Sequence, residues 1–186
     1  MLAELQKCLS DMDPAAAHVR VQHPFVVLCH VLSWRDAVER YRAALEDTAW
    51  ARAAALAELL AAGEVLCARA VACLIVAGAR AVQQAVARAV AEPDATRRER
   101  VRPELAELFA FLRDTEGVLS AAVARHVARV VLETSLPPFV SAVLDGSGAA
   151  EGPSAEALQH AARMIEQCVG AGVAGQCSLM NLIKRL

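Results

Sequence analysis

Apolar residues recur at helical spacing along most of the chain, and the polar residues between them mark exposed helix faces. Residues 2–12 suit a short amphipathic helix. His23 and Pro24 open a second helix, because proline is tolerated in the first turn. Residues 25–32 of this helix are apolar, whereas its second half is charged. We therefore expect the first half to be buried and the second half to be exposed.

The longest helical pattern covers residues 47–91 and contains no proline. Three charged residues recur in it at every eleventh position: Glu58, Arg69 and Arg80. Eleven steps of about 100° return close to the starting angle, so these charges form one narrow stripe on a mostly apolar helix. So thin a polar stripe is typical of a helix in the middle of a bundle. Gly63 or Gly78 could divide the helix in two, because glycine weakens a helix interior.

The second half of the chain predicts several shorter helices. Pro103 opens one, whose apolar face consists of Leu105, Leu108, Phe109 and Leu112. The next helix ends or bends at Pro137 and Pro138. Residues 145–153 are rich in glycine and form a loop. Ser154 then caps a helix that runs to about Val169.

A glycine-rich turn at residues 170–177 and a short final helix complete the prediction. No strand pattern and no repeat appear along the chain. Hydrophobic residues make up 56% of the sequence but aromatic residues only 4%, so most of the apolar side chains are alanine, valine and leucine. We expect an all-α fold, in which residues 1–186 form a single domain of about six to eight helices around a central apolar helix.

Charge and targeting signals narrow the function. The formal net charge is −2 and the basic residues are scattered, so we expect no binding of nucleic acid. The first residues are charged where a signal peptide would be apolar. The most apolar stretch, Ala70–Ala79, lies between two arginines, and a membrane span needs about 20 residues, so we expect no transmembrane segment. The six cysteines form no Cys-x-x-Cys pair, which favours reduced thiols in the cytoplasm.

No catalytic constellation is evident in the sequence. Residues 170–175 match the Gly-x-Gly-x-x-Gly pattern, but a dinucleotide site also needs a preceding strand, and here the preceding segment is helical. Ser147 lies between two glycines without the strand–turn–helix context of a nucleophilic serine. The five histidines show no metal-ligand spacing. We therefore expect neither an enzyme nor a metal or other cofactor.

One segment of the long apolar helix resembles a known family. Residues 55–66 read Ala-Leu-Ala-Glu-Leu-Leu-Ala-Ala-Gly-Glu-Val-Leu. This segment is similar to the third homology motif of the Bcl-2-like family, with Glu64 in place of the usual aspartate. The matching positions are Leu59, Ala62, Gly63, Glu64 and Leu66. Residues 132–140 look like the helix end that precedes the family's second motif, while the Asn-Trp-Gly-Arg signature is absent.

The resemblance implies a non-enzymatic interaction module that binds an amphipathic helix and regulates apoptosis or signalling. It also implies that the five matching residues contact the partner. In a continuous helix Glu64 lies off the charge stripe and needs a basic partner, within this chain or on another. The alternative is that Gly63 shifts the helical phase, which leaves Glu64 solvated. Two alternatives stay open. The bundle could enclose an apolar or lipid ligand, or the protein could be a structural or scaffolding subunit that acts as a homo-oligomer, most simply a homodimer.

Overall fold

The fold is known from a computed structural model, which describes residues 3, 4, 7, 10, 22–44, 54–92, 99–114, 121–144 and 154–185. These residues are almost entirely helical and contain no strand, so the expected all-α bundle with a long apolar helix is confirmed. The chain divides into two compact units, Met1–Ala77 and Gly78–Leu186. The expected helix at 2–12, the glycine at 117 and the loop at 145–153 lie mostly or wholly outside the described residues.

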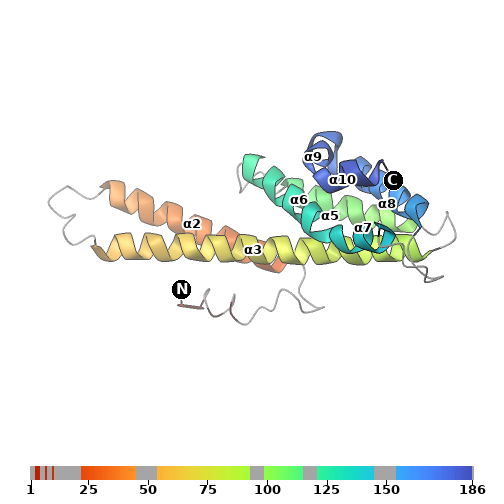
Figure 1. The fold of residues 1–186 in the computed structure, drawn as a ribbon. Helices are drawn as coiled ribbons and strands as arrows, with labels where there is room; N and C mark the ends of the chain where they lie inside the picture. Colours follow the sequence, from red (N-terminus) through yellow and green to blue (C-terminus); the bar gives the residue numbers. More distant parts are fainter. Residues whose placement is uncertain are drawn as a thin grey trace. The chain divides into compact units, whose positions relative to one another are not determined.

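The first unit contains helix α2 (Gln22–Ala44) and the beginning of helix α3 (Ala54–Ala91), which run antiparallel beside each other (Figure 1). In the first half of α2 the side chains of Val27, Leu28 and Val31 are buried, whereas Tyr41 near its end is 61% exposed. The predicted change from a buried to an exposed half is therefore confirmed in part, because Val26 in the first half is 53% exposed.

Helix α3 is continuous, and the prediction that a glycine divides it is wrong. Both candidate glycines lie where a neighbouring side chain fills the space of a Cβ atom. A Cβ at Gly63 would lie 2.6 Å from Cζ3 of Trp34, and one at Gly78 would lie 2.9 Å from Cγ2 of Val131. Close packing at these two points offsets the lower helix propensity of glycine, about 1 kcal/mol at each.

The second unit begins at Gly78 and contains the rest of α3, followed by the shorter helices. These are the 3₁₀ turn η2 (Glu99–Val101), α5 (Arg102–Asp114), α6 (Ala121–Ser135), α7 (Pro137–Leu144), α8 (Ala155–Val169), α9 (Ala171–Gln176) and α10 (Ser178–Ile183). Helix α5 packs against α6 and α8, and α8 packs against α9 and α10 (Figure 1). The core consists mainly of Leu105, Phe109, Leu112, Val131, Leu132, Leu158, Ile165, Met180 and Ile183.

Local signals in the sequence set several boundaries of these helices. Pro103 lies in the first turn of α5, and the two prolines at 137 and 138 open α7 directly after α6 ends. Ser154 caps α8, since its Oγ accepts a hydrogen bond from the backbone N–H of Ala157 at 3.1 Å. These predictions are confirmed.

The glycine-rich segment after α8 differs from the prediction. Gly170 ends α8 with φ 88°, a conformation that glycine adopts without strain. The next six residues form the short helix α9 rather than a turn. Ala174 and Cys177 are completely buried, so tertiary packing overrides the low helix propensity of Gly172 and Gly175.

Candidate functional site

The most unusual surface of the first unit is an apolar face of α3. Val65 and Val76 are 60% and 41% exposed. Leu59 is 40% exposed as well, but it lies on another side of the helix. Alanines at four further positions on or beside the face of Val65 and Val76 are also exposed: 57, 61, 68 and 72. Apolar side chains gathered along one face of a helix mark a contact surface more often than isolated ones do. We call residues 57, 61, 65, 68, 72 and 76 the exposed α3 face.

The five residues singled out by the family resemblance lie on different sides of α3. Leu59, Ala62 and Glu64 are exposed, whereas Gly63 and Leu66 are buried. Gly63 faces Trp34 of α2, so it holds the two helices together rather than meeting solvent. Exposure does not put these residues on one face, because Leu59 precedes Leu66 by seven residues and shares its side of the helix, whereas Ala62 and Glu64 lie about 200° apart.

Glu64 is solvated in the first unit. Its side chain is exposed, and it forms no ion pair with any of the residues that the structure describes. Its charge reaches Cys67, one turn further along α3. Burial raises the pKa of the Cys67 thiol, the Arg35 guanidinium lowers it and the Glu64 carboxylate raises it further. Glu64 is therefore solvated within the described part of this chain, although α3 continues through Gly63 without a break.

Helix α3 also has the length and composition of a membrane span. The segment Ala57–Ala91 is the one described helix that meets this criterion, and 22% of its most apolar window is buried. Core helices of soluble proteins meet the same criterion, but such helices are mostly buried. Both Glu64 and Arg69 are exposed within this segment, and ionised groups are costly in the hydrocarbon core of a bilayer.

The second unit contains a small apolar pocket between α5, α6, α8 and α9. Its volume is about 160 Å³. Most of its wall consists of apolar side chains, from Phe109, Leu112, Ala124, Ala128, Val169 and Val173. Arg125 and Cys168 also line it. Pockets that hold drug-sized ligands usually measure about 300–1,000 Å³. This pocket therefore fits one apolar side chain or a very small apolar molecule.

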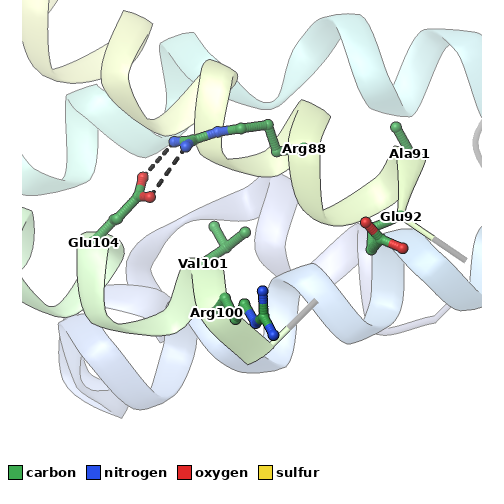
Figure 2. A pocket seen from close by; sticks show the side chains of 6 residues that line it. All are labelled: Arg88, Ala91, Glu92, Arg100, Val101 and Glu104. Atoms are coloured by element: carbon green, nitrogen blue, oxygen red, sulfur yellow. Dashed lines mark hydrogen bonds and ion pairs between the residues drawn. The ribbon is translucent and has the colours of Figure 1, made fainter. Parts of the chain in front are cut away.

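A larger and more open hollow lies between the end of α3, η2 and α5. It measures about 580 Å³, and Figure 2 shows the side chains around it. Arg88 and Glu104 form a two-pronged ion pair across it, with Nη1 of Arg88 3.0 Å from Oε1 of Glu104 (Figure 2). Arg100 and Glu92 add one charge of each sign. The arginine is already neutralised and the signs are mixed, so this hollow favours neither an anion nor a cation.

Histidines and acids do not gather into a metal centre within the described ranges. His160 on α8 lies 3.5 Å from Oε1 of Glu99, whose other oxygen pairs with Nε of Arg102 at 2.8 Å. The 3.5 Å distance between His160 and Glu99 suits a weak electrostatic contact rather than a hydrogen bond. In agreement, the buried Nε2 of His160 has no hydrogen-bond partner among the described residues. This contact joins η2 to α8.

The described cysteines carry free thiols: Cys29, Cys67, Cys73, Cys168 and Cys177. Burial raises the pKa of each thiol above its ordinary value. A raised pKa keeps a thiol protonated at neutral pH, and the protonated form is a poor nucleophile. These cysteines therefore act as small apolar side chains in the packing of the two units.

The fold and these surfaces define an all-α protein with an exposed apolar helix face. Comparison with family models, with curated proteins and with solved structures finds no match for this chain. The sequence resemblance to the Bcl-2-like family accordingly stays a prediction. The resemblance drew attention to the same helix but did not predict the extent of the exposed face, which a seven-residue spacing of alanine and valine could have indicated.

Proposed function

We propose that this protein is a non-enzymatic helical interaction module, whose binding surface is the exposed α3 face. The observation that carries the proposal is the solvent exposure of apolar residues at successive turns of one face of α3, two of them valines. Burying such a face against another helix removes apolar area from water at about 25 cal/mol per Å². Small alanine side chains also let a second helix approach closely.

The partner that suits this surface is an amphipathic helix with its own apolar stripe. Ala62 and Glu64 flank the exposed α3 face on opposite sides and would contact the partner helix, whereas Gly63 would act indirectly by fixing α2 against α3, and Leu59 and Leu66 lie on the other side of the helix. The sharper proposal, a divergent Bcl-2-like regulator of apoptosis or signalling in the cytoplasm, rests on the sequence resemblance of residues 55–66. This sharper proposal requires a partner protein that carries an amphipathic helix.

The alternative of a bundle that encloses a lipid has less support. The apolar pocket between α5, α6, α8 and α9 is about 160 Å³, smaller than the sites that hold lipid-sized molecules. The alternative of a homo-oligomeric scaffold uses the same exposed α3 face and differs only in the identity of the partner.

A pair of matched variants tests the proposal. Val65→Arg places a charge in the exposed α3 face, and Val123→Arg places the same charge at an exposed valine of α6 in the second unit. Tagged full-length protein would be cross-linked in lysate, and the cross-linked peptides identified by mass spectrometry. We expect a protein cross-linked to residues 57–76 that Val65→Arg loses and Val123→Arg retains.

Three results would count against this function. The two variants could capture the same proteins as the wild type, or the cross-links could map away from α3. A stoichiometric lipid recovered without any protein would favour the ligand-binding alternative. Circular dichroism of both variants would verify that each remains helical, which is expected because both valines are exposed. A change Gly63→Glu would be a poor test, because it would disrupt the contact with Trp34.

A further inference from the structure

The exposed α3 face has the spacing of a coiled-coil contact. Five apolar residues follow one another at alternating intervals of four and three positions: Ala61, Val65, Ala68, Ala72 and Ile75. The first four are exposed and the last is half-buried. This spacing corresponds to the a and d positions of a heptad repeat, with Val65 and Ala72 at a. Two successive heptads of such positions favour a partner helix that runs alongside α3.

The opposite side of α3 is already occupied. Gly63, Ala70 and Ala77 recur every seven residues and are buried, as are Leu66 and Leu74 next to them. Gly63 lies against Trp34, so this side faces α2 at Gly63. The helix therefore has two apolar sides in the first unit, and among the described residues only one of them is covered. Contact with α2 also keeps α3 helical before any partner binds, which removes much of the ordering cost of association.

Two charged residues flank the exposed side and are complementary to each other. Glu64 directly precedes an a position and Arg69 directly follows a d position, so they lie on opposite edges at positions g and e. They are five residues apart, whereas residues on one helix interact at spacings of three or four. Both side chains are exposed, and neither forms an ion pair with another described residue.

A five-residue spacing from g to e is the one at which two parallel helices pair across their contact. In a parallel, in-register pair, Glu64 of each copy meets Arg69 of the other, so one sequence supplies both ion pairs. In an antiparallel pair the same edges face each other, which places Glu64 on the side of its own equivalent.

We propose that the partner of the exposed α3 face is a second copy of this chain, bound in parallel and in register through residues 61–75. The inference rests on the proposed function, because it uses the same surface. Val65 meets its equivalent at the a layer, the alanines at 61 and 68 meet theirs at the d layers, and the two Glu64–Arg69 pairs close the edges. The contact spans about two heptads, so the dimer is weak and depends on concentration.

Charge reversal separates this arrangement from others. Sedimentation analysis of the full chain would compare the wild type with Glu64→Arg, Arg69→Glu, the double variant and an equal mixture of the two single variants. Each single change turns both cross-pairs from attractive to repulsive, which raises the dimer Kd about tenfold at the usual strength of exposed pairs. The double variant restores the wild-type Kd. The mixture restores it as well, because each mixed dimer contains two opposite-charge pairs.

A cysteine substitution tests the register. Ala68→Cys places a thiol at a d layer, where the two copies face each other, and Ala62→Cys places one at an exposed edge position as a matched control. We expect mild oxidation of the Ala68→Cys variant to join the introduced thiols of two copies in a disulfide, as read by mass spectrometry of the linked peptides. The same treatment should leave the introduced thiol of the control variant unlinked.

Several outcomes would overturn the dimer. The wild type could stay monomeric up to its solubility limit, or the mixture of Glu64→Arg and Arg69→Glu could have a dimer Kd no lower than that of either variant alone. The protein could also be a monomer that floats with phosphatidylcholine vesicles. The proposed function would fail separately. If the chain is monomeric but Val65→Arg still abolishes capture of a different protein, the exposed α3 face binds that protein and only the second-copy assignment is wrong.

Discussion

Replacing Gly78 by alanine should destabilise the protein, although helix propensity alone predicts the opposite. Gly78 lies inside α3, where alanine is favoured over glycine by about 1 kcal/mol. A Cβ atom there would lie 2.9 Å from Cγ2 of Val131, and ordinary contacts begin at 3.4 Å. Val131 is completely buried and β-branched, so it has little freedom to move away.

The magnitude follows from these two opposing effects. Overpacking a rigid core costs about 1–3 kcal/mol. After the gain in helix propensity is subtracted, we expect Gly78→Ala to lower the free energy of unfolding by about 1 kcal/mol. Urea denaturation followed by circular dichroism would measure it, together with Val131→Ala and the double variant. Because Val131→Ala removes the overlapping methyl group, the two changes should couple favourably by about 2 kcal/mol.

A glycine without close neighbours provides the control. Gly172 lies in α9, and a Cβ atom there would meet nothing within 4 Å. Gly172→Ala should therefore be neutral or stabilise the protein by up to about 1 kcal/mol. The reasoning would be refuted if Gly78→Ala stabilised the protein as much as the control, or if the double variant showed no coupling with Val131→Ala.

Two other predictions concern the second unit. Ser154→Ala removes the side chain that caps α8 and should lower the free energy of unfolding by about 1 kcal/mol, whereas Ser154→Asp should retain most of the stability. Urea denaturation would measure both variants. An unchanged midpoint for Ser154→Ala would contradict the role of the cap. Cys177 should resist alkylation until the protein unfolds, because it is completely buried and burial raises the pKa of its thiol; mass spectrometry of alkylated peptides at native and denaturing urea concentrations would show this. Rapid labelling of the native protein would contradict the burial of Cys177. Since the folded state favours the protonated thiol, the contribution of Cys177 to the free energy of unfolding is complete at neutral pH and declines as the pH rises above about 9.

The boundaries of many helices could be read from local chemistry. The cap at Ser154, the proline in the first turn of α5 and the proline pair that opens α7 act through their own backbone and their nearest neighbours. Such effects do not depend on the rest of the fold, which is why the sequence predicted them. The alternation of buried and exposed halves in α2 follows from the same kind of local pattern.

The candidate surface was only partly predictable. The segment 55–66 was predicted to be a contact from its resemblance to a family motif, but the sequence could not tell which of its residues face solvent. That division depends on Trp34, which lies more than 20 residues earlier and occupies the space beside Gly63. The position of the ring sets which side of α3 is covered, and thereby leaves Val65 and Glu64 exposed.

The glycines within helices separate most clearly what the sequence alone determined from what tertiary packing decided. The sequence determined an all-α protein, because apolar periodicity and the absence of strand patterns are properties of the chain itself. It could not determine whether Gly63 and Gly78 break α3 or whether Gly172 and Gly175 lie in a turn. In both cases a helix persists, because contacts with Trp34 and Val131, or burial around Ala174, outweigh a propensity cost of about 1 kcal/mol per glycine. Local preference sets the default conformation, and only packing between distant residues decides where that default is overruled.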